Sequence, residues 1–378
     1  MSTLSNRPSP SSTQLSQLSS RGVPIESLLE ACKACSEDCD DNEDVDPYPK
    51  GFDVDMESDM LGSFGGFARQ VVISTGKRDW DREVTDSPNS LAQLLRDEYA
   101  STTTSESSKP SFLNNLARKF SSNLSLSSQS SQNDEPIPGV HPSIVRDERT
   151  TSKTLSVLNS SFVSNSHEGH RESVMVFPDY RIVHDVEAKK EHAKEMVERY
   201  LSVDNEGRRI GESSEGSQLK SWPLPYRAVI LLCSHKKRDR RCHLAAPLLA
   251  SQFHHHLERH DLHVDERGED LEHELPIEDW IGTAEEKEKE LEEKLRGNQE
   301  GSERVGMFMI SHIGGHKFSG NVVIQFPNGT CIYYGRVTPA DVGVIVDRTI
   351  MQGKIIPEFL RGGLGIDGKN GAKGILDW

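Results

Sequence analysis

Apolar residues gather in two parts of the chain, and in each part short apolar runs alternate with amphipathic segments. In the first part, residues 24–203, β-branched apolar runs at 69–74 and 174–177 predict buried strands. A further extended piece at 181–183 and a helix at about 186–201 follow the later strand. Strands and a helix in this order indicate a small α/β domain.

The second part, residues 222–361, has the clearer pattern. A nearly continuous apolar run at 226–232 predicts a central strand, and a helix at about 242–260 and another strand at 307–310 follow it. Residues 321–335 predict a hairpin, because an Asn-Gly pair in their middle supplies the positive φ angles of a tight turn. With a final helix, the order is strand, helix, strand, hairpin, helix, which is that of a thioredoxin-like core.

Polar stretches flank and interrupt these two parts. Half of the first twenty residues are Ser or Thr, so residues 1–23 are expected to be disordered. A Ser- and Thr-rich insertion at 101–133 has the same character. Glu, Gly and Ser predict a linker at 204–221, and the glycines of 362–378 predict a flexible tail.

Composition and charge exclude several classes of partner. The 378 residues are 34% apolar, with a mean hydropathy of -0.60 and a net charge of -16. A chain this acidic does not bind nucleic acid or acidic lipid through its net field. No apolar run is long enough for a membrane-spanning helix. We therefore expect neither nucleic acid nor a membrane as a partner.

The cysteine content and the N-terminus bear on location. Six cysteines are too few for a disulfide scaffold and indicate a reducing compartment, and no apolar secretory signal is present. Only Arg7 and Arg21 precede the first acidic residue, and Pro8, Pro10 and Pro24 interrupt any amphipathic helix, which disfavours a mitochondrial presequence. We expect a soluble cytoplasmic protein, with a mitochondrial location as the weaker alternative.

Cys233 and Cys242 bracket the loop between the first strand and the first helix of the second part. In a thioredoxin-like arrangement, chemistry takes place on this loop. Five cations in the loop and the start of the helix should favour thiolates. The spacing is too wide for the Cys-x-x-Cys of a dithiol oxidoreductase, and Asp239 stands where a cysteine phosphatase needs its phosphate-binding arginine. A metal or cluster site is the remaining interpretation.

His312 and His316 are candidates for the other ligands of such a site. The Gly-Gly pair between them indicates a loop at the end of the strand at 307–310, and a loop there can aim both imidazoles at one centre. Two thiolates and two imidazoles suit zinc and a [2Fe–2S] cluster equally well. The spacing alone does not choose between the two.

Long motifs in both parts resemble the sucrase/ferredoxin-like family, and more closely its fungal actin-patches-distal branch. In the second part they are Leu-Leu-Cys-Ser-His-Lys-Lys-Arg-Asp-Arg-Arg-Cys at 231–242, Ala-Pro-Leu-Leu at 246–249, His-Ile-Gly-Gly-His-Lys-Phe-Ser-Gly-Asn at 312–321 and Tyr-Gly-Arg-Val-Thr-Pro at 334–339. In the first part, Ile-Ser-Thr-Gly-Lys-Arg-Asp-Trp at 73–80 is similar to the family's first domain. The resemblance spans about residues 24–90 and 170–378.

This resemblance implies two thioredoxin-like domains in tandem, of which only the second binds a [2Fe–2S] cluster. It implies that Cys233 and Cys242 hold one iron and that His312 and His316 hold the other. It further implies single-electron transfer in redox homeostasis or in resistance to oxidative stress, by a carrier rather than a catalyst, between a donor and an acceptor that the sequence does not identify.

The ligand set has consequences for the reduction potential. Neutral imidazoles in place of thiolates should raise the potential above that of an all-cysteine ferredoxin. The cations at 236–241 should favour the reduced state and offer a docking surface to an acidic electron partner. His235 and His243 are expected near the ligands or at the surface, because no Rieske-type Cys-x-x-His occurs.

The chain ends in Leu376-Asp377-Trp378, and an aromatic residue with a free carboxylate is an effective peptide anchor. This ending resembles the carboxyl-terminal tripeptide by which client proteins are recruited to the cytosolic iron–sulfur assembly machinery. The resemblance implies that machinery as a partner and agrees with a cytoplasmic location.

Alternatives remain open at this point. The same four ligands can hold zinc in an interaction module without redox activity, or Cys233 can serve a thiol-dependent enzyme. Cys32, Cys35 and Cys39 are spaced for a further metal, although the acidic residues around them suit exposed reduced thiols equally well.

Overall fold

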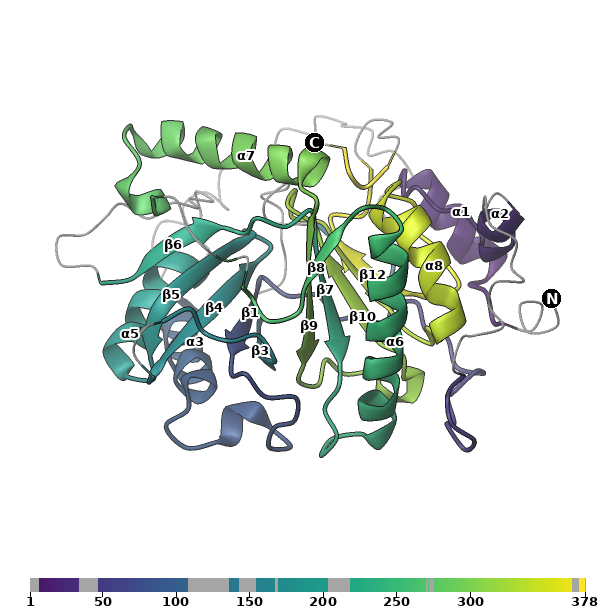
Figure 1. Ribbon diagram of the computed structural model, residues 1–378, viewed down its shortest axis with the longest axis horizontal. Helices are drawn as coiled ribbons and strands as arrows, with labels where there is room; N and C mark the ends of the chain where they lie inside the picture. Colours follow the sequence, from purple (N-terminus) through teal and green to yellow (C-terminus); the bar gives the residue numbers. More distant parts are fainter. Residues whose placement is uncertain are drawn as a thin grey trace, which may run out of the picture.

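The computed structural model describes residues 7–33, 47–107, 136–142, 154–166, 169–202, 218–269, 271, 275–368 and 374–377. Within them, twelve strands form one mixed sheet with helices on both of its faces (Figure 1). The mixed α/β class predicted from the sequence is confirmed. No helix in these ranges is both long enough and apolar enough to span a membrane.

The first half of the sheet is built around a strand whose residues are all buried. β1 (Arg69–Ser74) runs parallel to β3 (Leu155–Ser160) on one side and antiparallel to β4 (Arg171–Phe177) on the other. β5 (Arg181–Glu187) and β6 (Lys220–Pro223) continue the sheet to its edge. The spatial order is therefore β3-β1-β4-β5-β6.

Helices of the first half pack on one face of these strands. They are the 3₁₀ turn η3 (Val84–Asp86), α3 (Leu91–Ser107), α5 (Lys190–Met196) and the π-helical turn η4 (Val197–Leu201), which continues α5. Because successive strand residues point to opposite faces, Val71 and Ile73 of β1 join the core beneath these helices, whereas Val72 joins the core on the other face.

The second half repeats the strand order of the first. β7 (Ala228–Cys233) runs parallel to β9 (Arg304–Ile310) and antiparallel to β10 (Val322–Gln325), which pairs with β11 (Cys331–Tyr334). The order β9-β7-β10-β11 thus matches β3-β1-β4-β5. Three short strands extend this half, namely β12 (Leu360–Leu364) beside β11, β2 (Val140–His141) beside β12 and β8 (His263–Asp265) beside β9.

Helices cover both faces of the second half. On one face lie α6 (Arg240–Glu258), the turn η7 (Pro339–Asp341), α8 (Val342–Val344), its π-helical continuation η8 (Ile345–Ile350), α1 (Ser12–Ser20) and α2 (Leu28–Lys33). The opposite face is covered by η5 (Ile277–Asp279) and by α7 (Ala284–Gly301), which buries Leu291 and Leu295 there.

β3 and β9 join the two halves into one sheet. Ser160 pairs with Ile310. The Ser161 N–H donates to the Met309 carbonyl at 2.9 Å, and the Met309 N–H donates to the Ser161 hydroxyl at 3.0 Å. On the face that α7 covers, one apolar core crosses this joint. The two halves therefore share a core.

The expectation of disorder at the N-terminus fails for residues 7–23. α1 lies within them, starts with a capping box at Ser11 and buries Leu18. Arg7 forms a 2.6 Å ion pair with Asp341, which is buried. The composition did not predict this ordered structure, because single residues, Arg7 and Leu18, hold a stretch that is otherwise rich in serine.

The other predicted polar stretches lie partly outside the described residues. The predicted insertion begins inside α3, and its remainder from residue 108 to 133 is outside. The predicted linker is described only from residue 218, where the chain enters β6. The predicted tail begins within β12, so its first residues are paired in the sheet rather than flexible.

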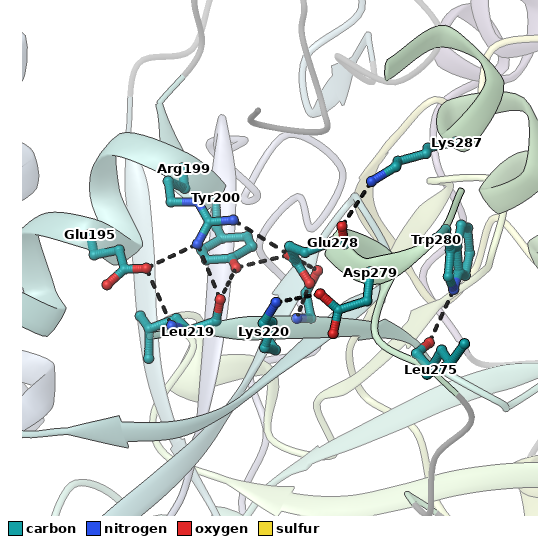
Figure 2. Close-up of polar contacts among 11 residues, drawn as sticks. Glu195, Arg199, Tyr200, Leu219, Lys220, Leu275, Glu278, Asp279, Trp280 and Lys287 are labelled. Carbon is teal, nitrogen blue, oxygen red and sulfur yellow. Dashed lines mark hydrogen bonds and ion pairs between the residues drawn. The ribbon is translucent and has the colours of Figure 1, made fainter. Parts of the chain in front are cut away.

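A buried carboxylate ties the start of α7 to the first half (Figure 2). Glu278 of η5 accepts hydrogen bonds from the Tyr200 hydroxyl at 2.9 Å and from the Ser221 N–H and hydroxyl at 2.8 and 2.7 Å. Burial and the charge of Glu278 raise the pKa of Tyr200, so its hydroxyl stays protonated and donates. The carboxylate of Glu278 therefore links η5 of the second half to η4 and β6 of the first half through hydrogen bonds.

Replacing Glu278 with Ala should destabilise the fold by about 2–4 kcal/mol, because the buried N–H and hydroxyl of Ser221 would lose their acceptor and the Tyr200 hydroxyl would keep only the Leu219 carbonyl. Asp279→Ala is the matched control, because Asp279 pairs with Lys220 at the surface and its loss should cost less than about 1 kcal/mol. Urea unfolding followed by circular dichroism measures both variants. Equal midpoints would show that Glu278 has no such role.

Candidate metal centre

The parallel register of β7 and β9 brings candidate ligands to one edge of the sheet. Cys233, the last residue of β7, pairs with Ile310, the last residue of β9. His312 follows two residues later, and its Nδ1 lies 3.9 Å from the Sγ of Cys233. Cys242 lies in the first turn of α6, with its Sγ 3.8 Å from the Ser319 hydroxyl. Both cysteines are reduced and buried.

The two histidines lie on the loop that the sequence predicts. His316 opens the short helix η6 (His316–Phe318), and its ring centroid lies 5.6 Å from that of His312. His312 is half-buried, whereas His316 is exposed. Gly314 and Gly315 between them have φ angles of 76° and 65°, which glycine adopts without strain. The pair of glycines lets the chain reverse so that the imidazoles lie near each other.

The surroundings of the candidate ligands shift their pKa values in different directions. Burial, and next the charge of Arg238, lower the pKa of His312 to about 4, so its ring is neutral at pH 7. The contact between the two thiols lowers the pKa of Cys242 and raises that of Cys233, which burial raises further. The expectation that both thiols ionise easily is therefore wrong for Cys233. This residue ends a buried strand, whereas Cys242 lies at the helix start.

Asn321 connects the two pairs of candidate ligands. Its backbone carbonyl accepts from the Cys233 N–H at 3.3 Å, and its side-chain amide donates to the Gly315 carbonyl at 3.2 Å. Its side-chain oxygen accepts from the Arg361 guanidinium at 2.7 Å, which also donates to the Gly314 carbonyl at 3.2 Å. Sequence analysis missed both residues. The available signal for Arg361 was a charged residue inside a short apolar strand.

His235 joins the ligand loop to the first half. Its Nδ1 accepts from the His312 N–H at 3.3 Å, and its Nε2 donates to the Trp80 carbonyl at 3.0 Å. This pattern requires the neutral ring with its proton on Nε2. The sequence predicts that His235 lies either near the ligands or at the surface. It is buried and lies beside the candidate ligand His312. His243, by contrast, is half-buried on α6.

Acidic residues of the first half neutralise part of the basic loop. Lys237 forms a 2.9 Å ion pair with Asp81, and Arg238 pairs with Glu83. The backbone of Lys237 also donates to Asp79 at 3.2 Å. Asp239 instead caps α6 by accepting from the Arg241 N–H and guanidinium. These cations are therefore used inside the molecule, which weakens the expectation that this loop docks an acidic partner.

No group of three or more His, Cys, Asp or Glu side chains in the described part of the chain is arranged to hold a single metal ion. The structure instead brings together two pairs, Cys233 with Cys242 and His312 with His316. Two thiols and two imidazoles form a donor set that fits a [2Fe–2S] cluster by ligand type.

The remaining cysteines lie elsewhere. Cys32 lies in α2 and is half-buried, and Cys35 and Cys39 lie outside the described residues. Cys331 is fully buried in β11, and burial raises the pKa of its thiol. A metal site at Cys32 therefore stays an untested prediction.

Residues 374–377 lie against the hairpin turn and the end of α7. The Asn328 amide donates to the Ile375 carbonyl at 2.7 Å, and the Gln299 amide donates to the Leu376 carbonyl at 2.5 Å. Ile375 is buried, whereas Asp377 is exposed. This end of the predicted flexible tail is therefore held on the body of the protein, and Trp378 lies outside the described residues.

Comparison with known proteins yields one family. The model of the Sucrase/ferredoxin-like family matches residues 60–362, which include all four candidate ligands. No solved structure matches the chain.

Similar proteins come from yeasts. A protein of Clavispora lusitaniae called altered inheritance of mitochondria protein 32 is 27% identical over 54% of this chain and 63% of its own length. Its namesake in Debaryomyces hansenii is 28% identical over 54% of this chain and 65% of its own length. Actin patches distal protein 1 of Saccharomyces cerevisiae is 32% identical over 33% of this chain and 30% of its own length. The chain thus spans just under two thirds of the first two relatives.

Gly315 provides a test of the loop geometry. A Cβ there would meet the Arg361 guanidinium, and its φ of 65° is unfavourable for other residues. Gly314 shares the positive φ, but nothing lies near its Cβ position. Gly315→Ala should therefore reduce the iron bound per chain at least about tenfold, because it adds a steric clash to backbone strain of roughly 1–2 kcal/mol.

The matched variant Gly314→Ala should retain most of the bound iron. Iron analysis of both proteins after anaerobic purification checks this expectation. Equal retention in the two variants would mean that the contact between Gly315 and Arg361 does not shape the centre.

Proposed function

Because the chain belongs to the sucrase/ferredoxin-like family, we propose that it binds a [2Fe–2S] cluster through Cys233, Cys242, His312 and His316. It would carry single electrons in redox homeostasis or in resistance to oxidative stress. The observation that carries this proposal is the pairing of β7 with β9, which sets a buried thiol 3.9 Å from a neutral imidazole.

The donor set supports a binuclear cluster. Each iron of such a cluster takes two protein ligands, and the candidate ligands come as two pairs from separate loops. When bound, the cluster would supply reversible one-electron transfer. The neutral imidazoles reduce its negative charge, so its potential would exceed that of an all-cysteine ferredoxin. His316 is the exposed ligand, so an electron partner would approach on its side.

We also propose that each half of the sheet is a thioredoxin-like unit and that the first lacks a cluster. The strand order that occurs twice supports this proposal. Ser74 ends the central strand of the first half, as Cys233 does in the second. Its hydroxyl donates to Glu172 at 2.9 Å. A serine in that position removes one of the thiolates that a cluster would need.

The carboxyl-terminal residues suggest a partner. We propose that Leu376, Asp377 and Trp378 are recognised by the cytosolic iron–sulfur assembly machinery and that the protein works in the cytoplasm. The body holds the carbonyls of Ile375 and Leu376, and Asp377 lies at the surface, where a partner can reach this end of the chain. The names of two relatives refer to the inheritance of mitochondria, so mitochondria are the alternative location. Cell fractionation distinguishes the two locations.

Anaerobic purification tests the main proposal. A visible spectrum, iron and sulfide analysis and electron paramagnetic resonance after dithionite reduction should show a [2Fe–2S] cluster with a rhombic reduced signal. A colourless protein that stays colourless after reconstitution and contains zinc would overturn the proposal and favour the zinc-stabilised interaction module.

Variants of the ligands sharpen this test. Cys233→Ser and Cys242→Ser should lose the bound iron, whereas Cys331→Ser, which changes a buried thiol remote from the loops, should keep it. His312→Cys should keep iron and lower the potential by on the order of 100 mV, because a thiolate replaces a neutral ligand. An unchanged potential in His312→Cys would show that His312 is not a ligand.

Deletion of Trp378 tests the proposed partner. The shortened protein should contain less iron than the full chain when both are isolated from cells, because its recognition by the assembly machinery would be weakened. Chemical reconstitution, which bypasses that machinery, should load both proteins equally. Equal iron content in cells would contradict the role of the carboxyl-terminal tripeptide.

A further inference from the structure

Arg361 is a fully buried cation next to the ligand loops. It is 1% exposed and lies in β12. Its guanidinium donates to the Ser63 hydroxyl at 3.1 Å, to the Gly314 carbonyl at 3.2 Å and to the Asn321 side-chain oxygen at 2.7 Å. All of these acceptors are uncharged. Hydrogen bonds of this kind solvate the donors but do not neutralise the charge.

Arg361 differs in this respect from the other buried arginines. A buried cation is costly unless an anion lies close to it. Within the described ranges, every other arginine of comparable burial has a carboxylate within ion-pair distance, whereas Arg361 has none. The pairs are Arg69 with Asp179 at 2.6 Å, Arg181 with Asp179 at 3.7 Å, Arg336 with Asp55 at 3.9 Å and Arg348 with Glu26 at 3.9 Å.

The contacts of Arg361 lead directly to the ligands. The Gly314 carbonyl belongs to the turn between His312 and His316, and Asn321 accepts the backbone N–H of Cys233. Burial lowers the pKa of Arg361, and the nearby ionisable groups Tyr333, Cys233 and Cys242 oppose this effect. An anionic group bound by the two cysteines would therefore lie where Arg361 lacks a countercharge.

We infer that Arg361 is the counterion of the reduced, negatively charged cluster held by Cys233 and Cys242 and that it positions the loop from His312 to His316. The inference rests on the proposed cluster. A [2Fe–2S] cluster with two thiolates and two neutral imidazoles is uncharged when oxidised, and one electron from an external reductant makes it singly negative. A fixed positive charge nearby in a low-dielectric interior favours the negative state. Arg361 thus raises the reduction potential.

This assignment separates Arg361 from the basic loop. Lys237 and Arg238 have carboxylate partners and lie nearer the surface, where water and salt weaken their field. Arg361 has neither a carboxylate partner among the described residues nor contact with solvent. The potential should therefore respond to the charge at Arg361 and only weakly to ionic strength.

The test is a redox titration of the purified, cluster-loaded full-length protein with dithionite. Arg361→Met should lower the equilibrium constant for one-electron reduction at least tenfold, which corresponds to a fall of about 59 mV. Arg348→Met is the matched control, because it removes a buried arginine of the same half that contacts neither ligand loop. It should leave the potential unchanged even where it destabilises the fold.

A second variant keeps the inference testable if Arg361→Met does not fold. Ser63 is exposed and its hydroxyl accepts from Arg361, so Ser63→Asp should neutralise the charge without disturbing the core. It should lower the potential in the same direction, whereas the uncharged Ser63→Asn should not. A wild-type potential in Ser63→Asp, or in a folded Arg361→Met, would overturn the inference. A wild-type protein without iron would overturn the proposed cluster itself.

Discussion

β7 and β9 lie side by side in a parallel register that runs from Ala228 and Val305 to Cys233 and Ile310. Since parallel strands end at the same edge of a sheet, the segment after each strand meets the other there. This pairing brings Cys233 beside the loop of His312, and the loop from β7 to α6 returns the chain so that Cys242, in the first turn of α6, joins them. A slip of one residue would turn the Cys233 side chain to the other face of the sheet and dismantle the arrangement.

The first half of the chain takes part in the centre although it supplies no candidate ligand. The joint between β3 and β9 sets the loop after β1 against the loop after β7. Trp80 then accepts from His235, and Asp81 pairs with Lys237. These contacts fix the backbone next to the ligands and cover it. The two halves are therefore joined next to the candidate ligands, and the family model extends across both.

Charge at the centre is organised in two layers. In the outer layer, Lys237 and Arg238 pair with carboxylates of the first half, so they stabilise the contact between the halves. The inner cation, Arg361, is held by neutral acceptors beside the ligand loops. An interior of low polarity transmits such a charge far more strongly than the surface does. If the proposed cluster is bound there, the inner charge should therefore act on it more strongly than the outer layer.

The sequence by itself determined the strand runs at 69–74 and 226–232, the α/β class and the loop between His312 and His316. These features depend on local patterns, namely alternating or continuous apolar residues and a Gly-Gly pair that needs positive φ angles. Only the tertiary structure decided that the halves share one sheet, that Arg7 and Leu18 anchor the N-terminal segment, and that Arg361 lies beneath the ligand loop. Each of these depends on contacts between residues far apart in the chain, and no local pattern encodes them.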